Sequence, residues 1–247
     1  MALIVILICL ALQHYWQLGL RFSRAQWLKA YLMVLHPLWG KGNFWYTLGG
    51  IILLLLPLPI LAGIIDVLLK GWLFDLLQLL FQVGVVWFCL NAYDYHLQSR
   101  DDEVFLQIAE QLFGVLFWYL LLGAAGAVGY YSVLLLARQN FNETERFRPA
   151  AQQLLNILAW APLRIVAVVF ALAGHFSACW EYCLQHILSK PSQNKTFITE
   201  AGLAALGKLA SDSTPEQTLQ ATLQLVDRTL FIVLVFLAIF TLGGWIM

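Results

Sequence analysis

The chain has 247 residues, of which 61% are hydrophobic and only 11% are charged. A soluble domain has roughly 45–50% apolar and about 25% charged residues, so this composition excludes an ordinary soluble protein and indicates a membrane protein. The formal net charge is +0. This balance excludes the broad basic surface of a nucleic-acid-binding protein and makes the lipid bilayer the first expected partner.

Apolar stretches long enough to cross a bilayer recur along the chain, since a span needs about 20 mostly apolar residues. Five stretches meet that length and the N-terminal one is a weaker sixth; in chain order they are 1–20, 44–69, 71–93, 113–137, 155–180 and 227–247. We therefore predict an all-α polytopic membrane bundle of five or six transmembrane helices, forming a single membrane domain over 1–247.

The stretch 1–20 resembles the core of a signal peptide without its other parts. No basic residue precedes "MALIVILICLAL", and the "QHYWQLGLRF" that follows is not a small-residue cleavage site. We expect an uncleaved first helix here.

The stretches 44–69 and 71–93 are joined by a connection too short for anything but a turn, which predicts a tight hairpin around Lys70. Asp66 lies one helical turn before Lys70, so the two side chains are expected to pair at the membrane surface. The two prolines of "LLPLPI" lie inside the first arm, and we expect them to kink it and to free backbone carbonyls.

The polar connection 21–43 concentrates basic residues, which predicts a cytoplasmic position for it and an external N-terminus; they are Arg21, Arg24, Lys29 and Lys41. Strict alternation also places 94–111 and 185–226 inside. It leaves 138–154 outside, although that connection carries Arg138, Arg146 and Arg148. Either one apolar stretch is re-entrant, or 113–137 turns back within the membrane.

The connection 185–226 is the one sizeable polar block. Within it, "FITEAGLAALGKLA" reads as an amphipathic helix, and "SDSTPEQ" reads as a loop in which Ser213 or Thr214 caps a further helix with Pro215 at its first position. We expect a cytoplasmic pair of helices lying against the membrane bundle.

The glycine-rich stretch "GAAGAVG" (123–129) is not a phosphate-binding loop, because it lacks both the spacing of such loops and a following lysine. Its small residues recur at intervals of four, which lets another membrane helix approach closely. The pattern favours helix packing.

The segment "HFSACWEYCLQH" places His175, Cys179, Cys183 and His186 within about one helix face. At about 1.5 Å of rise per residue, its outer members are over 16 Å apart, so four ligands from one helix cannot surround one zinc ion. We predict no metal site and no cofactor.

Charged residues gather in "QSRDDEVFLQIAEQ" (98–111), where the chain re-enters the membrane. The cluster of Asp101, Asp102, Glu103 and Glu110 beside Arg100 would suit magnesium bound to phosphate groups. Acidic residues in a first helical turn also simply complement the helix dipole, and that interpretation is preferred.

A single arginine interrupts the apolar run "LAWAPLRIVAVVFALAGH" (158–175), two residues after a proline. A guanidinium near the middle of a bilayer costs about 2.5–3.5 kcal/mol on insertion scales, so other groups must hold it. We expect Arg164 to point into the bundle near Pro162 and to face the 94–119 region. Its expected partner is a carboxylate such as Glu110 or Asp94, an anionic ligand or polar backbone.

Three stretches of the chain resemble the AmpE family of bacterial inner-membrane proteins: "FGVLFWYLLLGAAGAVGYYSVLLLA", "NETERFR" and "LAWAPLRIVAVVFALAGHF". The stretch 14–35 and the closing hydrophobic helix also look like AmpE, so the resemblance covers nearly the whole chain. It departs from the family in nearly lacking the polar insert that AmpE proteins usually carry before "LFWY".

AmpE is itself similar to the membrane synthases of cobalamin biosynthesis, which join an aminopropanol arm to a corrinoid carboxylate. The shared landmarks are Phe117, Trp118, Tyr119, Gly123, Gly126, Pro162 and Arg164. Where the synthases carry Asn, Asp-Gly and further Asn and Asp residues, this chain has Gln107, Glu110, Gln111, Leu134, Ala137, Leu155 and Asn156. Because most of the Asn and Asp side chains of the synthases are missing here, the comparison favours a non-catalytic protein.

The resemblance implies a regulatory or signalling role connected with β-lactamase induction and cell-wall recycling, at the bacterial inner membrane. The alternatives are a cobalamin-type amide synthase and a small-molecule or lipid transporter scaffold. The lack of an obvious repeat or of paired broken helices counts against the transporter.

The expected partners are the bilayer, another membrane or cell-wall-recycling protein, and an anionic small ligand. The candidate ligand or structural cavity is predicted from Arg164, Pro162, Glu110, Gln107, Asp94, Asp101, Asp102, Trp118 and Arg100.

Overall fold

The computed structural model describes residues 2–15, 31, 47–69, 75–90, 101–138, 146–207 and 215–242. These residues form helices joined by turns, with no strand among them, which confirms the all-α prediction. Within them, four helical segments are long and apolar enough to cross a membrane: Leu48–Leu68, Val104–Arg138, Arg148–Ala173 and Gln220–Ile239. A shorter apolar helix covers Leu76–Leu90. The protein is an α-helical membrane bundle.

The chain divides into two compact units. One unit comprises Ala2–Asp94 and Val115–Leu158, and we call it the hairpin unit. The other comprises Met1, Tyr95–Gly114 and Ala159–Met247, and we call it the arginine unit.

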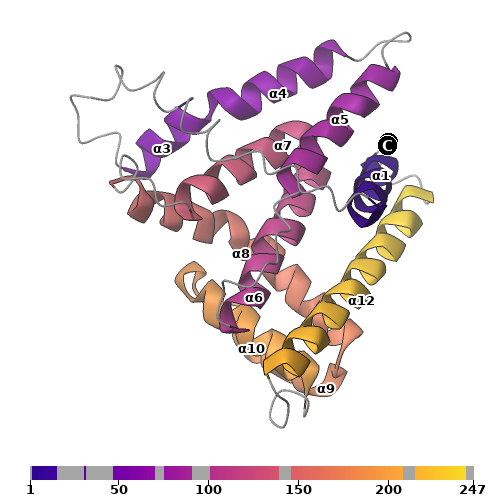
Figure 1. Cartoon of the computed structure of the whole chain (residues 1–247). Coiled ribbons are helices and arrows are strands. Elements are labelled where there is room, and N and C mark those ends of the chain that lie inside the picture. Colours follow the sequence, from indigo (N-terminus) through magenta and orange to yellow (C-terminus); the bar gives the residue numbers. More distant parts are fainter. Residues whose placement is uncertain are drawn as a thin grey trace. The chain divides into compact units, whose positions relative to one another are not determined.

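The hairpin unit contains α1 (Ala2–Tyr15), α3 (Leu48–Leu55), α4 (Pro57–Leu68), α5 (Asp75–Leu90) and α7 (Val115–Arg138). Within it, α4 and α5 pack against α7, as Figure 1 shows in purple and pink. The separation of α3 from α4 falls at Leu56, because Pro57 and Pro59 have no N–H to continue the helical hydrogen bonding.

Glycines let α4 and α7 approach each other closely. A Cβ atom on Gly129 would lie 3.4 Å from the Cβ of Pro59, and one on Gly63 would lie 3.5 Å from the Cβ of Ala125. The prediction that the stretch 123–129 serves helix packing is therefore confirmed at Ala125 and Gly129.

A hydrogen-bonded chain of polar side chains joins the same three helices. Oδ1 of Asp66 accepts hydrogen bonds from Nε2 of Gln78 at 3.2 Å and from Nε2 of Gln82 at 2.8 Å. The hydroxyl of Tyr119 donates to Oε1 of Gln82 at 3.1 Å. The predicted pairing of Asp66 with Lys70 lies outside the described residues.

The arginine unit contains α6 (Asp101–Ile108), a π-helix (Ala109–Gly114), α9 (Phe176–His186), the 3-10 turn Pro191–Gln193, α10 (Asn194–Leu206) and α12 (Pro215–Leu242). The helix α8 (Arg148–Ala173) contributes its residues from Ala159 onward. The expected amphipathic helix is α10, and α12 begins at Pro215 as predicted.

The apolar stretch 155–180 is divided between two helices, because α8 ends at Ala173 and α9 begins at Phe176. The chain turns back at Gly174. A Cβ atom there would lie 2.4 Å from the carbonyl oxygen of Ala205, so only glycine fits.

Helix α9 runs antiparallel to both the second half of α8 and α10. Sγ of Cys179 lies 3.6 Å from the carbonyl oxygen of Ala167 on α8 and 3.3 Å from that of Ala201 on α10. The backbone N–H of His175 donates to the carbonyl of Ala205 at 2.7 Å. Helices α9 and α10 both extend from the C-terminal end of α8 back to the turn 187–194. That turn therefore lies beside the middle of α8, at Arg164.

Candidate functional site

Arg164 is the centre of the candidate site, and its side chain is only 5% exposed. Nε donates to the carbonyl of Ile187 at 3.2 Å, and Nη1 donates to the carbonyl of Trp160 at 3.3 Å and to Oδ1 of Asn194. Nη2 donates to the carbonyl of Ser189 at 3.0 Å and to its hydroxyl at 2.7 Å. A guanidinium has five N–H groups. These five acceptors therefore satisfy all of its donors.

Two aromatic rings enclose the same guanidinium. Its Cζ atom lies 4.9 Å from the ring centroid of Trp160 and 4.6 Å from that of Phe197. The indole N–H of Trp160 also donates to the carbonyl of Ser189 at 2.9 Å. Because cations are attracted to aromatic faces, the rings add to the hydrogen bonds while excluding water.

The position of these acceptors explains how a buried cation is tolerated here. Ile187 is the C-cap residue that directly follows α9, so its carbonyl has no partner from the helix itself. The C-terminal end of a helix also carries partial negative charge, which favours a cation. Arg164 therefore caps α9 and fastens the turn 187–194 to α8.

A second contact joins Trp118 to the backbone carbonyl of Leu158, four residues before Pro162 in α8. Proline has no N–H, so in α8 the carbonyl of Leu158, four residues earlier, loses its usual helical donor. The indole N–H of Trp118 donates to this carbonyl at 3.2 Å, and both groups belong to the hairpin unit. The tryptophan thereby satisfies the acceptor that the proline leaves free.

The helical backbone of α7 is interrupted at Gly123, five residues after Trp118. Gly123 has φ 65° and ψ −149°, a conformation that L side chains rarely adopt. A Cβ atom on Gly126 would lie 2.2 Å from the carbonyl oxygen of Trp118, so the break also requires glycine there. Two of the glycines that the sequence assigns to helix packing therefore shape the backbone beside Trp118.

The remaining predicted site residues are distributed as follows. Glu110 is buried in the π-helix of the arginine unit, with its side chain 1% exposed, and Gln107 is half-buried in α6. Asp101 and Asp102 are the first residues of α6. Asp94 and Arg100 lie outside the described residues. The carboxylate partner expected for Arg164 stays a prediction.

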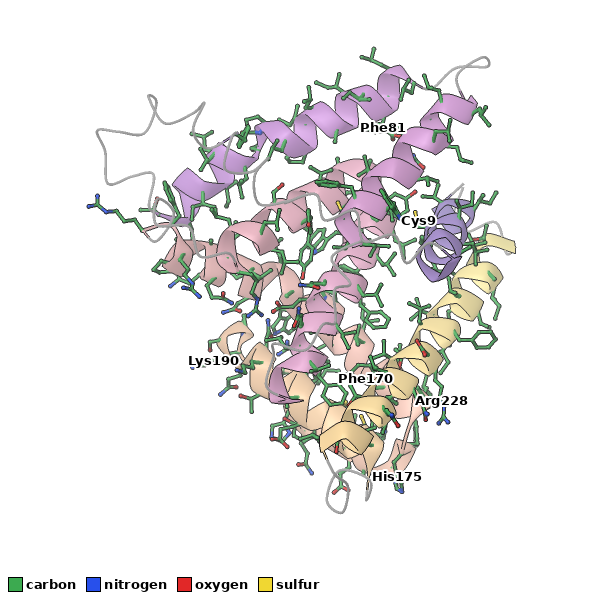
Figure 2. All side chains as sticks on the ribbon, viewed as in Figure 1. Cys9, Phe81, Phe170, His175, Lys190 and Arg228 are labelled. Carbon is green, nitrogen blue, oxygen red and sulfur yellow. The ribbon has the colours of Figure 1, made fainter. Side chains whose placement is uncertain are left out.

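The expected polar backbone does hold Arg164, through the carbonyls of Trp160, Ile187 and Ser189. The side chains of Ser189 and Asn194 were not expected from the sequence. Ser189 and Asn194 lie 25 and 30 residues further along the chain. The one signal for them is the polar run "SKPSQN", which interrupts an otherwise helical region. Figure 2 places Lys190, within this run, and His175 at opposite ends of α9.

The histidines and cysteines of α9 do not form a common site. Cys179 and Cys183 are buried, whereas His175 and His186 are exposed. In the described part of the chain, no group of three or more His, Cys, Asp or Glu side chains could hold a metal ion.

Comparisons with known proteins place the chain in a family. The sequence model for the regulatory signalling modulator protein AmpE matches residues 105–247, which is more than half of the chain. The chain is also 32% identical over 113 residues to the cobalamin biosynthesis protein CobD of Chromobacterium violaceum, a match covering 44% of this chain and 36% of that relative. It thus spans little more than a third of the curated relative. No solved structure matches. The chain belongs to the AmpE family.

Proposed function

We propose that this protein is a multi-pass inner-membrane regulator, without catalytic activity, that acts in β-lactamase induction and cell-wall recycling. Its family is described as a regulatory signalling modulator, which supports the regulatory part of the proposal. The connection with β-lactamase and cell-wall fragments rests on the family resemblance.

The observation that carries the proposal is the way Arg164 is used. A catalytic or anion-binding arginine must direct N–H groups toward a ligand. Here all five N–H groups meet neutral oxygens of Trp160, Ile187, Ser189 and Asn194. All N–H groups of Arg164, the residue that most resembles a catalytic group in the sequence, are thus used in hydrogen bonds that stabilise the fold.

A second candidate is an enzyme of cobalamin biosynthesis, which the similarity to CobD favours. Three positions at which the resembling synthases carry Asn or Asp speak against it. Leu134, Ala137 and Leu155 are apolar here, with exposures of 3%, 1% and 0%. Such residues contribute packing and supply no acid, base or metal ligand.

Deletion of the gene in its own host separates the two candidates. We expect the deletion to change the ratio of β-lactamase activity with and without an inducing β-lactam, and a plasmid copy of the wild-type gene to restore it. Growth without added corrinoid should be unaffected. An unchanged induction ratio would contradict the regulatory role, and a corrinoid requirement would establish the enzyme instead.

A further inference from the structure

Helices α9 and α10, which we call the α9–α10 pair, begin and end at the C-terminal end of α8. The backbone N–H of His175, directly before α9, donates to the carbonyl of Ala205, near the end of α10, at 2.7 Å. A Cβ atom on Gly207, directly after α10, would lie 3.4 Å from Cδ2 of His175. The chain therefore enters and leaves the pair at the same end of α8.

The turn 187–194, at the other end of the pair, lies beside Arg164 in the interior of α8. Nε of Arg164 donates to the carbonyl of Ile187 at 3.2 Å, and Nη1 donates to Oδ1 of Asn194. From Arg164 to Ala173, the last residue of α8, the helix rises about 14 Å, which is close to half of a hydrocarbon core about 30 Å thick. Because α8 is a membrane span, the turn lies near the middle of the membrane.

The lengths of α9 and α10 suit a segment that reaches the middle of the membrane and returns. Their 11 and 13 residues span about 16 Å and about 20 Å. A complete crossing needs about 20 residues in one helix. Neither helix therefore crosses the membrane by itself.

The exposed residues of α8 show that lipid surrounds the same half of this helix. From Ala159 onward they are Ile165 and Leu172, each 50% exposed, and no polar residue of α8 is exposed there. A helix side that faces lipid is apolar, because charged and polar side chains turn toward the bundle interior or toward water. The apolar side of α8 reaches Ile165, next to Arg164, so lipid extends to the level of the turn.

Four consecutive residues of α9 point to four sides of the helix, since each residue turns it by about 100°. Sγ of Cys179 lies 3.6 Å from a backbone carbonyl oxygen of α8. The ring of Tyr182 stacks on that of Phe197 of α10, with centroids 6.0 Å apart. Between these packed sides, Trp180 and Glu181 are exposed. The side of Trp180 adjoins the one that contacts α8, and the side of Glu181 adjoins the one that contacts α10.

Each exposed side keeps its character along α9, because residues four positions apart share one side of a helix. The apolar side consists of Phe176, Trp180 and Leu184. The polar side consists of Ser177, Glu181 and Gln185. The first two turns of α10 are polar on their exposed side as well, with Lys195, Thr196 and Glu200. The pair thus separates an apolar surface from a polar one.

Charged side chains at membrane depth occur where water or protein covers them. Both Glu181 and Lys190, which lies in the turn, are exposed. We propose that the α9–α10 pair is a re-entrant hairpin, which enters the membrane beside α8 and leaves it on the same side. The apolar side of α9 contacts phospholipid acyl chains, and the polar sides of α9 and α10 face water that enters from the C-terminal end of α8. Water thereby reaches the middle of the membrane at the turn.

Spin labels along the apolar side of α9 test this placement in full-length protein reconstituted into phospholipid nanodiscs. A nitroxide is attached in turn at Phe176→Cys, Trp180→Cys and Leu184→Cys, with the native cysteines replaced by alanine. Accessibility to oxygen, which concentrates in lipid, is divided by accessibility to a water-soluble nickel chelate to give the depth of each label. The matched control is Gln185→Cys, next to Leu184 in sequence but on the polar side.

We expect the depth to increase steadily from position 176 to position 184, by about 12 Å in total. The label at position 185 should favour nickel, although it lies at nearly the same depth as position 184. These results would support a helix that enters the membrane with one side in lipid and one side in water.

Three other results would overturn the proposal. Equal depths at the three apolar positions would show that α9 lies along the membrane surface. Nickel access at all of them would show that the pair lies outside the membrane. Shielding of position 184 or 185 from both reagents would show that protein covers that side. None of these results bears on β-lactamase induction.

A measurement that leaves the cysteines intact provides the second arm. The fluorescence of Trp180 is obtained as the difference between wild type and Trp180→Phe. It should fall when the nanodisc phospholipids carry bromine on their acyl chains. Unchanged difference fluorescence in brominated lipid would contradict a position of α9 within the membrane.

Discussion

The contact between Trp118 and the carbonyl of Leu158 exists, on this account, because Pro162 leaves that carbonyl without a donor. Trp118→Phe keeps an aromatic ring but removes the indole N–H that donates at 3.2 Å. A buried acceptor left unsatisfied costs about 1–3 kcal/mol. We expect the free energy of unfolding to fall by about that amount, plus a smaller loss of packing.

A double-mutant cycle isolates the hydrogen-bonding part of this loss. In Pro162→Ala, the new backbone N–H can bond the carbonyl of Leu158, so Trp118→Phe should then cost less by about 1 kcal/mol or more. The packing loss is common to both backgrounds and cancels. Unfolding is followed by circular dichroism during titration with a denaturing detergent in mixed micelles.

The matched control is Trp180→Phe, which removes an indole from a partly exposed position on α9. It should change stability by less than about 0.5 kcal/mol in either background. An identical cost of Trp118→Phe with and without Pro162 would refute the link between the proline and the tryptophan.

Two further predictions concern the hairpin unit. Gly126→Ala places a Cβ atom 2.2 Å from the backbone oxygen of Trp118 and should destabilise the protein by about 1–3 kcal/mol. In the control Gly84→Ala, the new Cβ meets no atom within 4 Å and should not destabilise the protein. Equal shifts of the melting temperature in the two variants would contradict the tight approach at Gly126. Gln82→Leu removes the hydrogen bond that Gln82 donates to Asp66 and the one that it accepts from Tyr119, and should lower the free energy of unfolding by about 1–3 kcal/mol. Gln78→Leu removes one hydrogen bond to Asp66 and should cost less. A detergent titration that ranks the two variants in the opposite order would contradict this arrangement.

The membrane class and the helical fold follow directly from the sequence, because long apolar runs in lipid have few ways to satisfy their backbone other than helices. The start of α12 at Pro215 was also predictable, since proline suits the first turn of a helix. The burial of Arg164 follows from the cost of exposing a guanidinium to lipid.

Polar backbone was among the predicted partners of Arg164, but its side-chain partners were not predicted. The search for an opposite charge pointed to Glu110 and Asp94, whereas Ser189 and Asn194 are neutral and far along the chain. They reach the guanidinium because the apolar stretch 155–180 breaks at Gly174 and folds back. Hydropathy does not reveal that break, since one histidine between glycine and phenylalanine interrupts the apolar run too briefly to separate two helices.

The break in α7 was hidden for a similar reason. Small residues at intervals of four favour a straight, closely packed helix, and Gly129 behaves in that way against Pro59. Gly123, six residues earlier in the same run, instead has a positive φ. Composition alone does not distinguish a glycine needed for close approach from one needed for backbone conformation.

The stability of Arg164→Leu tests the central claim, that this arginine holds the fold together through neutral oxygens. Ser189 keeps the indole N–H of Trp160, so the main losses fall on the carbonyl of Ile187 and on Oδ1 of Asn194. At about 1–3 kcal/mol for each acceptor, detergent titration should show a loss of about 2–6 kcal/mol.

Two matched variants accompany this measurement. Arg164→Lys should recover part of the loss, because lysine keeps the charge but offers three donors in place of five. Arg148→Leu, at the exposed first residue of the same helix, should change stability by less than about 0.5 kcal/mol. An Arg164→Leu protein as stable as wild type, or more stable, would contradict the claim.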